Sequence, residues 1–275
     1  MVDYELVEYA KSRVRTIMAK SKLYGVDYAI NPYIGCEHGC VYCYARFVYI
    51  SMGKDPLEWG KRVVAKANAV ELLKREVVRN RRGVVLISSV TDPYQPLERR
   101  EFLTRRILEV LHRYGYPVVI LTKSDLVLRD IDLFKKFSEI EVGLTITSLN
   151  DDVREIFEPM APKPENRIRA LKMLVKEGIR TYALIGPLLP LFVDKEIDSL
   201  LETLADIGVG RILVDKLNLK AKNWVSINIA LRNNLDPHTV SEFWRAARST
   251  QYFLSLKKKI TRRSKELGLQ IDFCY

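Results

Sequence analysis

The chain has 275 residues, of which 48% are hydrophobic, and carries a formal net charge of +11 with a pI of about 9.4. This length can bury a substantial core. No stretch approaches the roughly 20 uninterrupted apolar residues of a membrane span, and the start MVDYELVEYAKSRVR lacks the apolar centre of a secretory signal. We therefore expect a soluble cytoplasmic protein.

The positive charge favours an anionic partner, either nucleic acid or an acidic electron-transfer protein. A solvated basic surface explains the charge equally well. The chain shows no internal repeat, low-complexity tract or Gly/Ser linker. The simplest interpretation is one compact domain with extensions.

After a basic amino-terminal arm, short apolar runs rich in β-branched residues alternate with longer stretches of helical periodicity. This alternation is typical of a parallel α/β architecture. The predicted strands cover residues 27–31, 83–88, 117–122, 141–147, 180–185 and 211–215. The clearest predicted helices cover residues 66–80, 101–115, 166–178 and 195–208, and the last three end at glycine. The sequence therefore predicts six βα units.

The alternation stops after residue 218. Residues 236–268 are predicted to form one long helix, opened by Asp236 with Pro237 in its first turn, that packs across the sheet or covers its mouth. The final LQIDFCY is a short apolar tail that we expect to turn Phe273, Cys274 and Tyr275 inward.

Each predicted strand ends in a polar cluster. The clusters are the cysteine loop, SSVTDPYQP, TKSDL, TITSLN, IGPLLP and DKLNLK, in chain order. Chemistry collects at the carboxyl ends of the strands in parallel barrels, so we expect these segments to meet at one face.

Three of the four cysteines, Cys36, Cys40 and Cys43, form a C-x3-C-x2-C loop that contains Gly35 and Gly39. One cubane cluster can accept three thiolates at this spacing, and the glycines permit a tightly wrapped backbone. Three ligands on four irons leave one iron open, which is useful only if something else binds it. The loop therefore predicts a [4Fe-4S] cluster with a substrate or cofactor on its fourth iron.

A structural zinc site formed by these thiolates with His38 or Cys274 is the alternative. Structural zinc normally pairs two C-x2-C hairpins or adds a regularly spaced histidine, and neither pattern is evident. We expect His38 to lie beside the ligands and not to be one. The tight clustering also argues against a disulfide framework.

The motifs NPYIGCEHGCVYCYAR, VTDPYQPLE, LTKSDLVLRDIDL and FEPMAPKPENRIRAL together resemble the spore photoproduct lyase-related branch of the radical S-adenosylmethionine (SAM) superfamily, also called DNA repair photolyase-like. The resemblance covers about residues 31–190, and includes the aromatic Tyr42 before the last cysteine. No recognised motif covers the carboxyl-terminal third.

The resemblance implies a partial (β/α)6 TIM-type barrel, and the end of the alternation after residue 218 adds a long C-terminal helical extension. We therefore divide the chain into an N-terminal basic arm (1–26), a radical SAM core barrel (27–220) and a C-terminal helical extension with its tail (221–275). The resemblance also implies that SAM chelates the open iron, and that its reductive cleavage gives a 5′-deoxyadenosyl radical that removes hydrogen from a substrate. A low-potential electron donor, ferredoxin or flavodoxin, is an expected partner.

By this resemblance, Lys123 pairs with the SAM carboxylate, although it could be an ordinary surface lysine. Ser89, Thr91 and Asp92 stand where the superfamily contacts the methionine amino group. Asp92 could also cap the following turn, because Asp-Pro commonly starts one. Both roles of Asp92 are compatible.

Thr145, Thr147 and Ser148 close the fourth predicted strand and suit the ribose hydroxyls or the methionine part of SAM. Strand alternation sends only some of them inward. Gly186 and Pro187 resemble the segment whose backbone lies against adenine.

Glu158 and Pro159 belong to the family signature. Glu158 either binds Arg167 or Arg169 structurally or contacts substrate. Ser89 stands where the lyase has a hydrogen-donating cysteine, and a serine O–H bond is too strong to quench a carbon radical. We therefore do not expect thymine-dimer reversal by the lyase's own route.

Cys274 could replace that donor if the tail inserts its thiol and Tyr275 into the barrel mouth, or it could be a small buried hydrophobe. Tyr42 and Tyr44 are expected to pack around the cluster, and Tyr94 to reach the active site. All three tyrosines could equally belong to the core.

Three functions remain open. The first is a radical SAM enzyme acting on DNA or RNA, and the second is the same chemistry on a peptide or small molecule. The third is a non-catalytic iron–sulfur or zinc protein that binds nucleic acid, which would not need a SAM pocket. A polyanion-sized groove would favour the first function if it were lined by Arg245, Arg248, Lys257, Lys258, Arg262 and Arg263.

Overall fold

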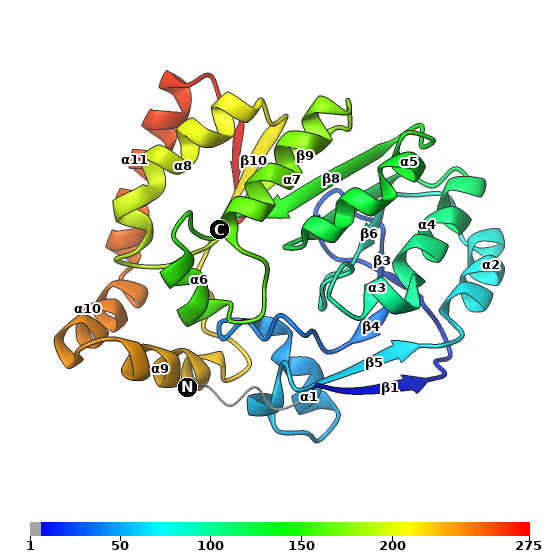
Figure 1. The fold of residues 1–275 in the computed structure, drawn as a ribbon, viewed down its shortest axis with the longest axis horizontal. Coiled ribbons are helices and arrows are strands. Elements are labelled where there is room, and N and C mark those ends of the chain that lie inside the picture. Colours follow the sequence, from blue (N-terminus) through cyan, green and yellow to red (C-terminus); the bar gives the residue numbers. More distant parts are fainter. Residues whose placement is uncertain (1–6) are drawn as a thin grey trace.

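The structure is a computed structural model and describes residues 7–275. Its centre is a curved eight-stranded sheet with the order β11-β10-β9-β8-β7-β6-β3-β2 (Figure 1). Every neighbouring pair is parallel except β2 and β3. The run from β3 to β10 follows chain order, as expected for consecutive βα units.

All six predicted strands are confirmed, with ends shifted by a few residues. They are β3 (Tyr28–Ile30), β6 (Val85–Ile87), β7 (Val118–Thr122), β8 (Ile140–Thr145), β9 (Thr181–Leu188) and β10 (Arg211–Lys216). Most of their β-branched and aliphatic side chains are buried, whereas alternate ones such as Val119, Leu121 and Leu213 are only partly buried.

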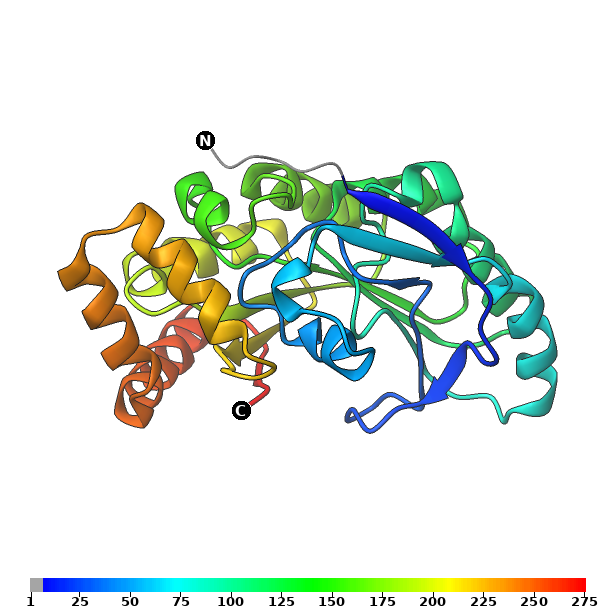
Figure 2. The same ribbon diagram turned by 90° about the horizontal axis from the view of Figure 1, so that it is seen from below.

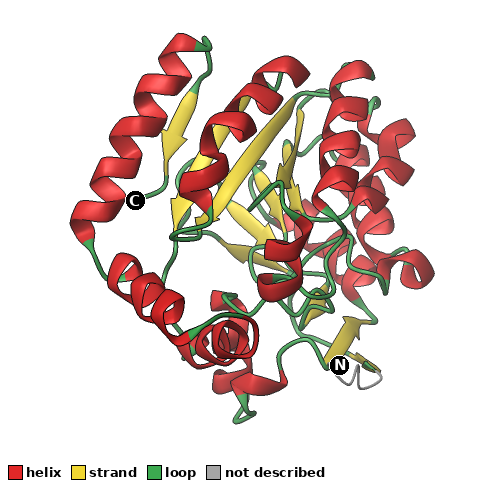
Figure 3. Ribbon diagram, turned by 60° about the vertical axis from the view of Figure 1, so that its left-hand side comes forward, coloured by secondary structure: helices red, strands yellow, loops and turns green. Residues whose placement is uncertain are grey.

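The predicted helices of the core are also confirmed, and they lie on the outer side of the curved sheet (Figure 3). They are α2 (Ala69–Arg79), α4 (Leu103–Arg113), α7 (Pro164–Lys176) and α8 (Val193–Ile207). Gly115, Gly178 and Gly208 have φ values of 66°, 73° and 77°. These glycines end their helices because the left-handed conformation costs them little.

The barrel is open, as predicted. Strand β11 (Ile271–Phe273) joins the free edge of β10, and β2 (Met18–Lys20) joins the opposite edge, so the described sheet does not close on itself. The shorter helices between the strands are α1 (Phe47–Ser51), α3 (Glu98–Glu101), α5 (Ile131–Phe134) and α6 (Asp151–Phe157).

A second, three-stranded sheet was not predicted. Its order is β1-β5-β4, formed by β1 (Glu8–Ser12), β5 (Arg62–Lys66) and β4 (Tyr33–Ile34). It lies beside the cysteine loop (Figure 2). The described part of the predicted arm 1–26 therefore contributes strands to both sheets, and residues 1–6 of that arm lie outside the described residues.

The prediction of one long helix over residues 236–268 is wrong. The segment forms α10 (Pro237–Ala247) and α11 (Thr250–Glu266), and α9 (Asn223–Asn234) precedes them. The chain breaks at Ser249, whose backbone is extended and whose side chain accepts the N–H of Tyr252 at 3.1 Å. A hydroxyl that starts a new helix this way competes with continuing the old one. Helix α11 packs on α8 as part of the outer layer (Figure 1).

The expectation that the tail turns three residues inward is wrong for Cys274. Phe273 and Tyr275 are partly buried and pack edge-to-face on each other, whereas Cys274 is exposed. Alternation along a strand puts neighbouring side chains on opposite faces, so the three could not all point the same way. The alternative that Cys274 is a buried hydrophobe is wrong as well.

Among residues 7–275, none of the helices combines the length and the apolar character needed to cross a lipid bilayer.

The cap of α11 gives a stability test. Replacing Ser249 by Ala removes the acceptor for the Tyr252 N–H, so we expect the free energy of unfolding to fall by about 1 kcal/mol in denaturant titrations. Ser255→Ala, at an exposed position inside the same helix, is the matched control and should change it by less than about 0.5 kcal/mol. Equal effects of the two substitutions would show that Ser249 does not set the helix break.

Candidate functional site

The three clustered cysteines lie in one loop between β4 and α1. Gly35 adopts φ +85°, and a Cβ there would lie 2.3 Å from the carbonyl oxygen of Arg62 on β5. Only glycine permits this close approach, so the loop rests directly on the small sheet. Hydrogen bonds from Gly39 to Cys36 O (3.2 Å) and from Cys43 N to Cys40 O (3.1 Å) curl the loop around its cysteines.

All three thiols line one cavity of about 190 Å³ at the carboxyl ends of the sheet strands. Burial raises the pKa of Cys36, Cys40 and Cys43, that of Cys40 to about 12, and the nearby Lys123 ammonium opposes the rise for Cys40. Buried thiols of this kind become thiolates when a metal supplies the compensating charge.

The donor set fits an iron–sulfur cluster. Three sulfur ligands converge on one space, and this space continues into a cavity that can hold a further ligand. Within residues 7–275, no three His, Cys, Asp or Glu side chains are placed to hold a single metal ion. A cluster uses one thiolate for each of several irons, so its ligands surround a wider space than the ligands of one ion do.

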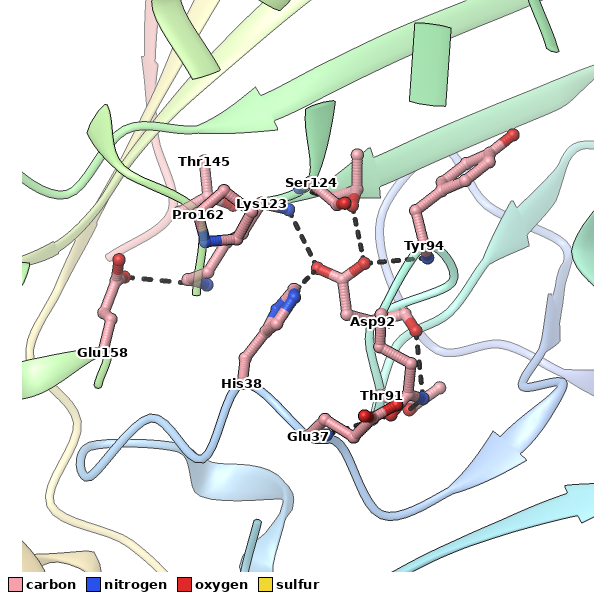
Figure 4. Close-up of polar contacts among 12 residues, drawn as sticks. Glu37, His38, Thr91, Asp92, Tyr94, Lys123, Ser124, Thr145, Glu158 and Pro162 are labelled. Carbon is pink, nitrogen blue, oxygen red and sulfur yellow. Dashed lines mark hydrogen bonds and ion pairs between the residues drawn. The ribbon is translucent and has the colours of Figure 1, made fainter. Parts of the chain in front are cut away.

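Asp92 lies at the centre of the polar contacts on one side of the cavity (Figure 4). Its carboxylate accepts the hydroxyl of Thr122 at 2.6 Å, the N–H of Lys123 at 2.8 Å and the N–H of Tyr94 at 2.9 Å. Nδ1 of His38 lies 3.4 Å from Oδ2 of Asp92. Burial alone would raise the pKa of Asp92, but the His38 imidazole and these hydrogen bonds lower it to about 2.

These contacts confirm that Asp92 caps the following turn, which is one of its two predicted roles. The bond to the N–H of Tyr94 is the turn cap that the Asp-Pro sequence predicts. The carboxylate also ties the end of β7 to the cysteine loop through His38. Thr91 has a similar task, because its hydroxyl donates to the carbonyl oxygen of Gly35 at 2.5 Å.

Lys123 is not an ordinary surface lysine. It lines the cavity, and only 17% of its side chain is exposed. Its Nζ lies 4.0 Å from Oε1 of Glu158 and 5.7 Å from the ring centre of Tyr42. Burial would lower the pKa of Lys123, but its electrostatic interactions with Cys40 and Glu158 raise that pKa above the usual lysine value, so the side chain stays an ammonium.

Glu158 is buried and bound by several elements. It forms an ion pair with Arg167 and accepts hydrogen bonds from Tyr42 and from Thr147. The structural role foreseen for Glu158 is therefore confirmed with Arg167, whereas the guanidinium of Arg169 lies 3.8 Å from Asp125 instead. Burial would raise the pKa of Glu158, but Arg167 and Lys123 lower it to about 2.

The structure brings most of the predicted site residues into this cavity. Its lining includes Ser89, Thr91, Asp92, Lys123, Thr145, Gly186 and Pro187, together with Tyr42 and Tyr44.

Four predicted site residues lie outside the cavity. Thr147 donates to Glu158 at 2.7 Å, and Ser148 donates to Glu196 at 2.5 Å. Tyr94 is fully buried and donates to Asp130 at 3.0 Å. Cys274 lies on the far edge of the sheet, where its N–H donates to the carbonyl oxygen of Val214 at 2.9 Å.

Sequence reasoning missed several lining residues. Asp215, Lys216 and Asn218 form one wall of the cavity at the end of β10. The polar cluster DKLNLK at the sixth strand end was the available signal for them. Burial raises the pKa of Asp215. Arg46 was missed entirely; it is buried beneath the loop and donates to the carbonyl oxygen of Cys40 at 3.2 Å.

The family model of the radical SAM superfamily matches residues 30–204. The chain belongs to the radical SAM superfamily. Membership implies an enzyme that uses SAM and an iron–sulfur cluster.

Related sequences come from several sources. The chain is 44% identical over 192 residues to the uncharacterized protein MJ0683 of Methanocaldococcus jannaschii, a match that covers 69% of this chain and 71% of that protein. It is 25% identical over 186 residues to a radical SAM Nalpha-GlyT isomerase of Pseudomonas phage M6. That match covers 66% of this chain but 38% of the isomerase.

Among solved structures, spore photoproduct lyase has the same fold. One mutant of it aligns with a TM-score of 0.70 at 15% identity and covers 96% of this chain and 82% of the lyase chain. Another mutant, with bound AdoMet and dinucleoside spore photoproduct, aligns with a TM-score of 0.71 at 13% identity, over 97% and 81% of the two chains. Identities this low show the fold alone, and that fold is the expected one.

The buried Glu158–Arg167 pair gives a sharp stability test. Arg167→Met leaves Glu158 buried without its counter-ion, so we expect the free energy of unfolding to fall by about 3–5 kcal/mol. Adding Glu158→Gln to that variant should restore part of the loss. Arg169→Met is the matched control, because Arg169 is largely exposed, and should cost at most about 1 kcal/mol. A similar loss in both arginine variants would contradict the buried pair.

Proposed function

We propose that this chain holds a [4Fe-4S] cluster on Cys36, Cys40 and Cys43, binds SAM in the adjoining cavity, and acts on nucleic acid. The observation that carries the proposal is the shared cavity. Three thiols from one loop line the same space as the buried Lys123 ammonium and the polar strand ends. A protein that only bound nucleic acid would not need this arrangement.

Different cavity residues bind different groups of SAM. The Lys123 ammonium binds the SAM carboxylate, because Glu158 at 4.0 Å satisfies its charge only partly. The hydroxyls of Ser89 and Thr145 accept or donate to the polar groups of SAM, and the backbone at Gly186 leaves room for the flat adenine. A bound, reduced cluster would supply the one electron that breaks the bond between the sulfonium and the 5′ carbon of SAM, giving methionine and a 5′-deoxyadenosyl radical.

The wall at the end of β10 faces the substrate. Asp215, Lys216 and Asn218 line it, and the backbone N–H of Lys216 donates to the Asp215 carboxylate. Cys274 directly follows the neighbouring strand β11, and burial raises its pKa, with a further contribution from the Asp215 charge. Cys274 and Tyr94 both lie outside the cavity. Their role as catalytic residues stays a prediction.

Two observations support a nucleic-acid substrate. The chain has a net charge of +11. The lyase structures that share its fold include one with a bound dinucleoside spore photoproduct. A ferredoxin or flavodoxin would supply the electron.

The cluster proposal is tested by anaerobic reconstitution. We expect about four irons and four sulfides per chain, and an electron paramagnetic resonance signal of the reduced cluster that changes when SAM is added. Cys36→Ala, Cys40→Ala and Cys43→Ala should each lose most of the iron, whereas Cys274→Ala should keep it. Stoichiometric zinc in oxygen-protected protein, or iron loss in Cys274→Ala, would overturn this assignment.

Lys123 has its own test. Lys123→Met should keep the iron but weaken SAM binding by about 10- to 100-fold in equilibrium dialysis, because one charge-assisted contact is lost. Lys172→Met removes an exposed lysine from α7 and should leave SAM binding unchanged. Unchanged SAM affinity in Lys123→Met would remove Lys123 from the site.

A further inference from the structure

A second, larger cavity lies outside the site described above. It has a volume of about 770 Å³ and lies between α9 and α10. Its lining includes Arg232 from α9 and Trp244, Arg245 and Arg248 from α10 and its end. The groove therefore concentrates three guanidinium groups, and none of the described residues that line it is acidic.

These three arginines are free to bind an anion. The ion pairs of the C-terminal helices use other cations, namely His238, Lys259, Arg262 and Arg263. Among residues 7–275, none of the groove arginines forms an ion pair. The guanidinium of Arg248 lies 5.6 Å from the ring centre of Trp244, whose indole N–H donates to Asn228 at 3.0 Å. The contacts among Asn228, Trp244 and Arg248 thus shape the groove, and its guanidinium groups remain available to bind an anion.

Helix α9 connects this groove to the cavity of the candidate site. The side chain of Asn223, at the start of α9, donates to the carbonyl oxygen of Tyr42 at 2.7 Å and to that of Asn218 at 2.8 Å. Both acceptor residues line the candidate-site cavity. The first turn of α9 is therefore docked at the edge of that cavity, and the rest of the helix leads away from it (Figure 2).

An aromatic side chain is exposed on the first turn of α9, next to Asn223. Trp224 is 52% exposed, which is unusual for so large an apolar group. Trp224, Asn228 and Arg232 are spaced four residues apart, so they share one face of α9. Lys220 and Lys222 are exposed on the loop just before the helix. An exposed indole flanked by basic side chains is the combination that stacks on bases and follows a phosphate backbone.

We propose that this face of α9, together with the groove against α10, binds single-stranded nucleic acid and leads it to the candidate site. Trp224 stacks on a base next to the one that enters the cavity, and Arg232, Arg245 and Arg248 bind phosphates further along the strand. The distance from Trp224 to Arg232 along the helix is about 12 Å, which gives room for a few nucleotides. This inference rests on the proposed nucleic-acid substrate and adds the surface that holds it.

The test uses the full chain with its reconstituted cluster. Binding of a fluorescein-labelled 20-nucleotide DNA or RNA strand is followed by fluorescence anisotropy over a range of salt concentrations. The triple variant Arg232→Gln/Arg245→Gln/Arg248→Gln should bind at least about tenfold more weakly, and its slope of log K against log salt should fall by about 2, since three phosphate contacts are lost. Trp224→Ala should weaken binding by about 5- to 100-fold with an unchanged slope.

The matched control removes the same charge elsewhere. Lys258→Gln/Arg262→Gln/Lys265→Gln changes three exposed basic residues of α11. It should weaken binding much less than the groove variant does. Equal losses in the two triple variants would mean that only net charge matters, and would overturn the proposed surface.

The result for the unmodified protein separates this inference from the proposed function. If it binds the strands and the groove variants bind equally well, the surface is wrong and the nucleic-acid substrate stands. If it releases 5′-deoxyadenosine with dithionite and SAM but binds neither DNA nor RNA, both the substrate and the surface fall. In that case the radical SAM assignment stands.

Discussion

The buried carboxylate of Glu158 is the constraint on which the candidate site depends. A charge removed from water must be compensated locally, or it destabilises the fold by several kcal/mol. Its partners come from separate elements: Tyr42 from the cysteine loop, Thr147 from the segment after β8 and Arg167 from α7. Satisfying one carboxylate therefore fixes the loop, the sheet end and the outer helix relative to each other.

On the other side of the cavity, the Asp92 carboxylate also fixes two elements relative to each other. It joins the end of β7 to His38 of the cysteine loop. Both carboxylates are engaged by several donors, and the Lys123 ammonium lies as far as 4.0 Å from the nearer oxygen of Glu158. The site thus presents a positive charge beside three thiols, a combination suited to a bound carboxylate next to a metal cluster.

The sequence predicts a site residue correctly when the parallel arrangement of the strands alone determines where that residue lies. Lys123 directly follows β7, Thr145 is the last residue of β8 and Gly186 lies near the end of β9, and the carboxyl ends of parallel strands meet at one edge. The prediction fails for Thr147 and Ser148 because β8 ends at Thr145, and the chain then turns both hydroxyls toward Glu158 and Glu196. The small sheet was missed because a long-range pairing such as that of β1 with β5 leaves little signal in local periodicity. The break between α10 and α11 was missed because one serine sets it.

The sizes of the two cavities have a consequence for how a polymer could be bound. The candidate-site cavity, at about 190 Å³, is small compared with a nucleic-acid strand. Most of the binding free energy for such a substrate must therefore come from surfaces outside it. The groove between α9 and α10, at about 770 Å³, adjoins the helix whose first turn borders the site.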